Sequence, residues 1–197
     1  MEMSGEERIP ASQDDTWAAL NDPEILKACV PGCESIDLLA QNEYQVLMVA
    51  RVGPVSAKFK GKLALSDLMP PHSYAIAFEG QGGAAGFGKG SAQVQLAPDG
   101  DGTKLSYQVK ASVGGKLAQI GSRLVDAAAR KIATDFFAAF NEKVAALHGA
   151  PAEVHEEHLP EPVPRDPDLP TVSDASLAFL AAGSLVVCAV ALIVLFG

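Results

Sequence analysis

The sequence predicts an α+β fold in which a curved antiparallel sheet wraps around one long C-terminal helix. Between residues 43 and 113, apolar and polar residues alternate, as expected for strands with one buried face. Residues 116–147 instead carry apolar residues at steps of three or four, as expected for a helix that buries one side. A helix of that length needs a broad apolar surface, and the alternating strands upstream can supply it.

The first 32 residues predict an edge strand followed by two short helices. Residues 1–9 form the expected strand, although their pattern is weak. Ser12 begins a sequence that resembles a capping box, so we expect a helix from there to Leu20. Asp22 and Pro23 are the preferred cap and first residue of a second helix, which must end at the Pro31-Gly32 turn.

From residue 33 the period changes to two, and about six antiparallel strands are expected. Gly53-Pro54 and the sequence Pro-Asp-Gly-Asp-Gly at 98–102 are strong turn signals between them. The clearest strand segments are residues 43–52, 55–65, 73–80, 90–96 and 103–113.

The predicted helix over residues 116–147 would be about 48 Å long at 1.5 Å per residue. Glycines precede it, and Gly149 and Pro151 follow it. Its expected buried stripe consists of Leu117, Ile120, Leu124, Ala128, Ile132, Phe136, Phe140, Val144 and Leu147.

The sequence divides into three parts: a domain over residues 1–149, a linker over 150–174 and a membrane helix over 175–197. The linker is rich in proline and acidic residues and has almost no large apolar residue, so we expect it to be extended and flexible. The last 23 residues carry no charge. A helix of that length measures about 35 Å, enough to cross a hydrocarbon core of about 30 Å.

Charge and cysteine content exclude several classes of function. Most of the net charge of -9 lies in the linker, so the domain is nearly neutral and lacks the basic face that nucleic-acid binding requires. No signal peptide opens the chain, and we expect the domain on the cytoplasmic face of the inner membrane as a tail-anchored, single-pass protein. Cys29, Cys33 and Cys188 are too few for a disulfide framework, and we expect no metal at the first two.

Two motifs nearly match known chemistry. Residues 83–89 differ by one position from a phosphate-binding loop, but a strand pattern follows them where a helix is needed, so a glycine-rich hairpin is preferred. His155 and His158 are spaced one residue too closely for the zinc motif, in a proline-rich segment. No nucleophile motif and no inward carboxylate pair occurs, so no catalytic residue is assigned.

The sequence instead predicts an apolar binding pocket between the sheet and the helix. Small residues on both elements leave either a close contact or a cavity, and strand parity alone does not decide between them. The polar contacts expected there are Tyr107 and Arg123. The pocket residues predicted from strand and helix parity are Met48, Phe59, Ile76, Phe78, Val94, Tyr107, Val109, Leu117, Ile120, Gly121, Leu124 and Ala128.

The domain also resembles a known family, that of the G subunit of carbon monoxide dehydrogenase. The similarity is carried by Asn-Asp-Pro at 21–23, Val-Pro-Gly-Cys at 30–33, Val-Gly-Pro-Val at 52–55, Gly-Thr-Lys-Leu at 102–105, the glycine-rich run at 113–124 and Phe136-Phe137. The resemblance implies the START-like helix-grip fold (the SRPBCC superfamily), in agreement with the pattern above. It also implies recruitment of a molybdenum hydroxylase of the CO dehydrogenase type to the membrane, and coupling of its electrons to respiratory quinones.

Our leading hypothesis is therefore a non-enzymatic, membrane-tethered accessory protein that holds an apolar lipid, with a respiratory quinone as the expected ligand and no covalent cofactor. Pro31, Gly32, Gly53 and Pro54 would form gate or docking loops. Two alternatives remain open: a membrane-docking adaptor without a ligand, in which these are merely turns, and a START-like cyclase or hydrolase.

Overall fold

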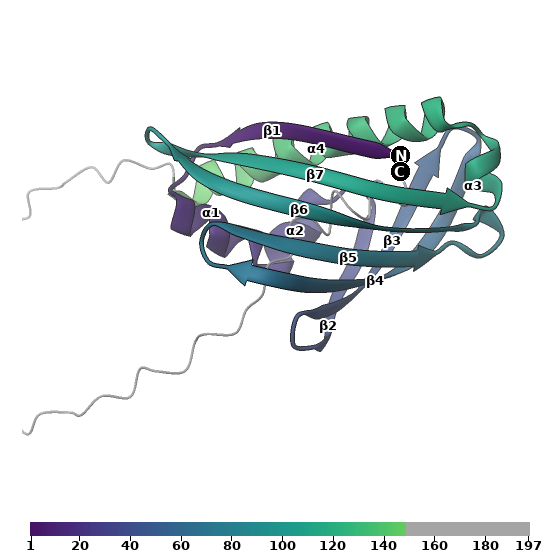
Figure 1. The fold of residues 1–197 in the computed structure, drawn as a ribbon, viewed down its shortest axis with the longest axis horizontal. Helices are drawn as coiled ribbons and strands as arrows, with labels where there is room; N and C mark the ends of the chain where they lie inside the picture. The colour runs from purple at the N-terminus through teal and green to yellow at the C-terminus, as the bar shows by residue number, and fades with distance from the viewer. Residues whose placement is uncertain (149–197) are drawn as a thin grey trace, which may run out of the picture.

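Seven strands form one antiparallel sheet in the order β1-β7-β6-β5-β4-β3-β2 (Figure 1). The computed structural model describes residues 1–148. The first and last strands of the chain pair with each other, which is how the sheet brings the N-terminus beside β7. The strands are β1 (Glu2–Ile9), β2 (Cys33–Ala40), β3 (Glu43–Val52), β4 (Val55–Met69), β5 (Ser73–Gln81), β6 (Phe87–Asp99) and β7 (Gly102–Gly114).

Two short helices follow β1, as the sequence predicts, and both begin at the expected caps. Helix α1 (Gln13–Leu20) is capped by the Ser12 hydroxyl, which accepts a hydrogen bond from the backbone N–H of Asp15. Helix α2 (Pro23–Cys29) is capped by the Asp22 carboxylate. These side chains satisfy helix N–H groups that have no partner within the helix.

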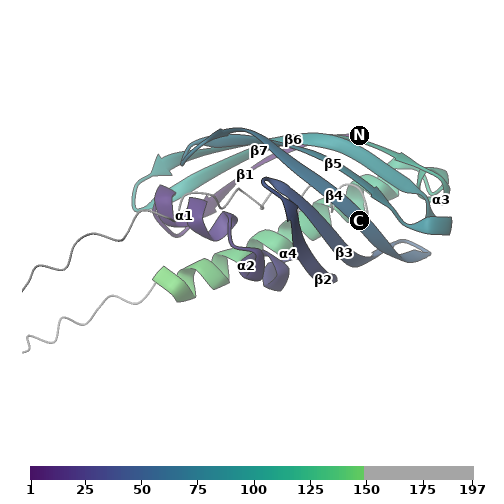
Figure 2. The ribbon, with the colours of Figure 1, turned by 90° about the horizontal axis from the view of Figure 1, so that it is seen from below.

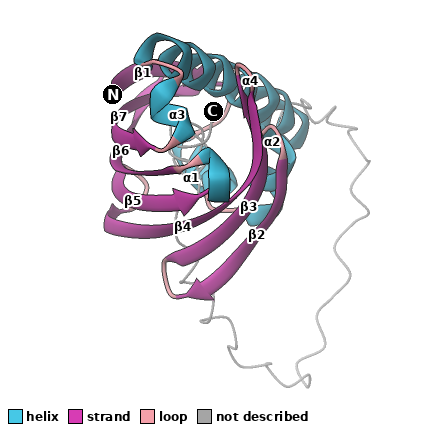
Figure 3. Cartoon of the chain, turned by 90° about the vertical axis from the view of Figure 1, so that its right-hand side faces the viewer, coloured by secondary structure: helices cyan, strands magenta, loops and turns pink. Residues whose placement is uncertain are grey.

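The sheet curves around helix α4 (Ser122–His148), which lies along its concave side (Figures 2 and 3). Inward side chains of the strands alternate with exposed ones and join the buried face of α4 in one apolar core. The helix-grip architecture predicted from the sequence is therefore confirmed for residues 1–148. The largest fully buried side chains include Phe59, Met48, Leu63, Ile76, Leu105, Phe136 and Phe140.

The predicted continuous helix over residues 116–147 is wrong in one respect. The structure has a short helix α3 (Lys116–Gln119), a break, and then α4. At the break Gly121 has φ +93°, a value that a right-handed helix does not allow. A residue with a side chain would be strained there, so glycine separates the two helices.

The strands are longer than the sequence pattern indicates. Strand β4 continues to Met69, past the predicted end at residue 65, and β6 begins at Phe87, three residues before the predicted start. The phosphate-loop-like segment contains the short 3-10 helix η1 (Gly83–Ala85) and joins β5 to β6, which agrees with the hairpin interpretation.

The predicted linker over 150–174 and the predicted membrane helix over 175–197 lie outside the described residues. Among residues 1–148, no helix has both the length and the apolar character needed to cross a bilayer.

Candidate functional site

Most of the predicted pocket residues lie on the concave face of the grip. Eight of them are at most 8% exposed and belong to the apolar core: Met48, Phe59, Ile76, Phe78, Val94, Tyr107, Val109 and Leu117. They come from β3 to β7 and from α3, so the strand parity read from the sequence places their side chains on one face.

The predicted helix contribution differs, because the buried stripe of α4 is displaced by one residue. Leu124 is 50% exposed, whereas the next residue, Val125, is 3% exposed. Ile120 and Ala128 are half-buried, and Gly121 is exposed in the break. The break resets the helical phase, so a stripe counted from residue 117 through a continuous helix no longer faces the sheet. The buried stripe of α4 runs through Val125, Ala129, Ala133, Phe136, Phe140 and Val144.

A patch of the concave face near α3 carries no side chains. Gly61 of β4 pairs with Gly80 of β5, and Gly80 pairs with Gly88 of β6. All three are buried, in register with inward neighbours. Gly90 follows on β6, where a Cβ atom would lie 2.7 Å from the ring of Phe78. These four glycines, here called the glycine patch, leave backbone exposed toward the interior of the grip.

Tyr107 is the inward polar residue predicted to contact a ligand, and it lies between the sheet edge and α4. Its ring stacks on Phe137 of α4, with centroids 5.6 Å apart and an angle of 23° between the planes. Its hydroxyl end covers Gly5 of β1, the residue directly opposite in register. Burial raises the pKa of Tyr107, the negative charge of Glu7 raises it further, and the positive charge of Arg130 lowers it.

The structure does not bring Arg123 to Tyr107. Arg123 is exposed at the start of α4, and Phe137, which Tyr107 contacts, lies about 14 residues or roughly 21 Å further along the helix. The cation on the Tyr107 side is Arg130. Sequence reasoning missed Gly5, Glu7, Arg130 and Phe137 because strand pairing and helix phase, which set their neighbours, are not local patterns.

The two predicted gate loops both adjoin β3. At Pro31-Gly32, the Gly32 carbonyl accepts a hydrogen bond of 2.9 Å from the backbone N–H of Val49. The Gly53-Pro54 turn ends the same strand, and a Cβ atom at Gly53 would lie 4.0 Å from the side chain of Leu124. The second loop therefore lies beside the break between α3 and α4.

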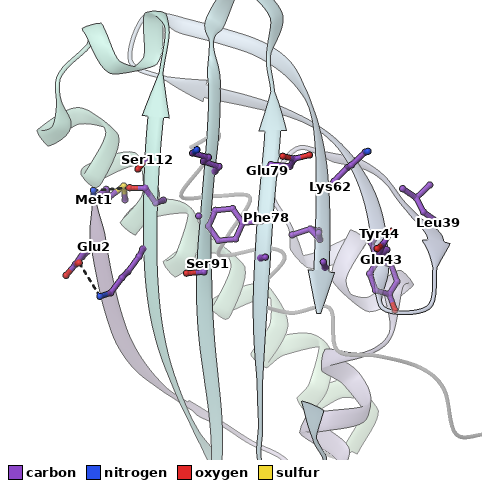
Figure 4. A pocket seen from close by; sticks show the side chains of 17 residues that line it. Met1, Glu2, Leu39, Glu43, Tyr44, Lys62, Phe78, Glu79, Ser91 and Ser112 are labelled. Carbon is purple, nitrogen blue, oxygen red and sulfur yellow. Dashed lines mark hydrogen bonds and ion pairs between the residues drawn. The ribbon is translucent and has the colours of Figure 1, made fainter. Parts of the chain in front are cut away.

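A second concave site lies on the opposite face of the sheet. It is an open depression of about 850 Å³, bordered by exposed side chains of two neighbouring cross-strand rows (Figure 4). One row joins Lys62, Glu79 and Lys89 across β4, β5 and β6. The other has only short side chains at its centre, Ala64, Ala77 and Ser91, which form the hollow.

The depression shares only Phe78 with the predicted pocket residues, and the ring of Phe78 is buried on the concave side. The depression was missed because it depends on three short outward residues becoming neighbours through strand register. Short outward residues at one level of adjacent strands were the signal available in the sequence.

The described residues offer little for catalysis. No group of three or more His, Cys, Asp and Glu side chains in residues 1–148 is placed to hold a metal ion. Both cysteines of this part are free, and burial raises the pKa of Cys29 and raises that of Cys33 to about 11. Their thiols are therefore protonated at neutral pH and poor nucleophiles.

Comparison with known proteins identifies relatives of the domain. A conserved protein of Geobacillus kaustophilus is 29% identical, with a TM-score of 0.70 over 74% of this chain and 96% of that chain. A START superfamily protein of Mycobacterium smegmatis is 16% identical, with a TM-score of 0.59 over 74% and 98% of the two chains. The Zhui aromatase/cyclase of Streptomyces sp. R1128 is 13% identical, with a TM-score of 0.58 over 78% and 98%. The last two similarities concern the fold alone.

Among curated proteins, no sequence matches the chain significantly. The profile of the CoxG family, described as the G subunit of carbon monoxide dehydrogenase, matches residues 5–145, which include every strand core and nearly all of α4. The chain therefore belongs to the CoxG family of carbon monoxide dehydrogenase.

Proposed function

We propose that this protein is a non-enzymatic accessory protein that binds an apolar lipid, a respiratory quinone, inside the grip. In this proposal residues 175–197 anchor it in the membrane, at the cytoplasmic face, and the domain recruits a molybdenum hydroxylase of the CO dehydrogenase type. The bound quinone then couples the electrons of that enzyme to the respiratory chain. Membership of the CoxG family supports an accessory role.

The observation that carries the ligand proposal is the glycine patch. Elsewhere on the concave face, large side chains of the strands fill the space up to α4. At Gly61, Gly80 and Gly88 three neighbouring strands contribute no side chain at the same level. Protein interiors are otherwise close-packed, so a bare backbone surface of this extent suits a flat apolar group.

Tyr107 supplies the polar contact in this proposal. A quinone carries two carbonyl oxygens on an otherwise apolar ring, and an oxygen of this kind needs a hydrogen-bond donor when it leaves water. The raised pKa of Tyr107 keeps its hydroxyl protonated and therefore able to donate. Arg123, the second predicted contact, is exposed at the end of α4 and is better placed at the entrance than beside the ring.

The test is mass spectrometry of lipid extracted from the purified full chain. We expect a quinone at a stoichiometry that survives washing. A matched pair of variants separates specific from adventitious lipid: Ala92→Leu adds volume on the concave face, and Ser91→Leu adds a side chain of the same size on the outer face. Loss of quinone in the first variant and retention in the second support the proposal, provided both melt cooperatively.

A chain that yields no quinone, or yields it equally in both variants, contradicts ligand binding inside the grip. If the empty chain still carries the hydroxylase to the membrane in fractionation, the protein is a docking adaptor. Co-purification of the hydroxylase with the full chain tests the recruitment part independently.

A further inference from the structure

One end of the domain combines exposed apolar side chains with basic ones. Here called the α3 end, it contains α3, the β3–β4 turn, the start of β6 and the first turn of α4 (Figures 1 and 3). Leu124 and Phe87 are each 50% exposed there, although large apolar side chains are otherwise mostly buried. Arg51, Lys116 and Arg123 are exposed at the same end.

Contacts between the loops hold this end together. The Gly53 turn lies against Leu124, as described above. Gly86, which follows η1, lies against the backbone of Gly114 and Gly115, just before α3. The ring of Phe87 covers Gly114 at the end of β7. The exposed apolar residues thus sit on loops braced by backbone contacts, at the end of the grip nearest the glycine patch.

The three basic residues are free to meet an external anion. None of Arg51, Lys116 and Arg123 forms an ion pair with another described residue. The opposite end of the domain is acidic: Asp14 and Asp15 lie in the first turn of α1, and the β6–β7 turn carries Asp99 and Asp101, which pair with Arg8. The long axis of the domain therefore carries charge of opposite sign at its two ends.

We propose that the α3 end docks onto the anionic surface of a phospholipid bilayer. Leu124 and Phe87 enter the interface between headgroups and acyl chains, while the basic side chains contact lipid phosphates. The acidic end is repelled by the same surface, so charge sets the orientation. In this orientation the α3 end of the grip faces the bilayer. This step rests on the proposed function, since an apolar ligand then passes between bilayer and glycine patch without crossing water.

Hydrogen–deuterium exchange on the full chain, reconstituted into vesicles, tests the proposal. One set of vesicles contains phosphatidylcholine alone, and the other contains equal parts phosphatidylcholine and phosphatidylglycerol. We expect slower exchange over residues 50–55 and 114–124 in the anionic vesicles only, with no change over residues 97–103 at the opposite end. Added salt should reduce the protection, because it screens the attraction.

Charge reversal provides the matched control. The Lys116→Glu/Arg123→Glu variant should lose the protection, by roughly fivefold in the docked population for each basic residue removed. Lys27→Glu/Lys143→Glu makes the same charge change at exposed positions outside the α3 end and should keep it. Equal exchange in the two vesicles, or equal protection in the two variants, overturns the proposal. Quinone in the extracted chain without such protection would contradict docking alone and leave ligand binding intact.

Discussion

Tyr107 of β7 and Phe137 of α4 form a stacked aromatic pair, with ring centroids 5.6 Å apart, at the edge where the sheet meets the helix. Phe137 also contacts Phe136 edge-on, at 5.1 Å between centroids, and Phe136 stacks on Phe140. This chain of rings fixes α4 against the sheet on the β1 side, and it sets the position of the Tyr107 hydroxyl.

We expect Phe137→Ala to destabilise the domain by about 3–5 kcal/mol, because Phe137 is almost completely buried and its removal leaves a cavity. Tyr107→Phe keeps the stacked ring and should cost much less. Urea unfolding of both variants checks this. Equal losses in the two variants would show that the hydroxyl, and not the ring contact, holds Tyr107 in place.

Gly5→Ala should destabilise the domain by about 1–3 kcal/mol, because the new methyl group would overlap the Tyr107 ring. The loss should shrink when Tyr107 is first replaced by Leu, which removes the phenol that the methyl group meets. A double-mutant cycle measures this coupling. Additive effects of the two substitutions would contradict the contact.

Gly121→Ala should cost about 1–2 kcal/mol, since φ is +93° at Gly121 and a residue with a Cβ atom is strained there. No atom lies within 4 Å of the position that the new Cβ would take, so the cost is conformational and not steric. Thermal unfolding is the measurement. A rise in Tm would instead indicate that α3 and α4 merge into the continuous helix that the sequence pattern predicts.

Glu6 and Glu7 are neighbours in β1 and should respond to pH with opposite signs. The side-chain hydrogen bond from Lys104 lowers the pKa of Glu6, so its ionised form is favoured in the folded protein. Burial raises the pKa of Glu7, whose ionised form is therefore disfavoured. Glu7→Gln should raise Tm at pH 7, and Glu6→Gln should lower it slightly.

Both effects depend on ionisation above the ordinary glutamate pKa of 4.5. The stabilisation from Glu6 is present above that value and is lost as pH falls through its lowered pKa. The penalty at Glu7 develops as pH rises from 4.5 through its raised pKa. The Tm differences from the unchanged protein should therefore vanish below about pH 4. A Glu7→Gln difference that persists at pH 3 would point to packing instead of charge.

Alkylation of Cys33 in the folded protein should be about 100-fold slower than in the unfolded chain at pH 7, because its pKa is about 11 in the folded state against an ordinary 9.0. Peptide mass spectrometry after iodoacetamide treatment separates Cys33 from the other cysteines. Equal rates in the two states would mean that Cys33 lies in solvent.

Much of the fold follows from local patterns. Ser12 and Asp22 cap their helices as expected, and the strand over residues 43–52 has the predicted bounds. Period-two alternation also assigned eight pocket residues to the concave face. Capping, turn conformation and strand parity depend on a residue and its near neighbours in the chain, so such patterns are sufficient to predict them.

Packing decided the rest. The break at Gly121 rotated α4 so that Val125 is buried and Leu124 is exposed, a shift of one residue that hydrophobic spacing cannot detect. Strand register placed Gly61, Gly80 and Gly88 side by side, and put Gly5 under Tyr107. These relations join residues far apart in the chain. They depend on which surfaces pack together when the apolar core is buried, and only the folded structure shows which these are.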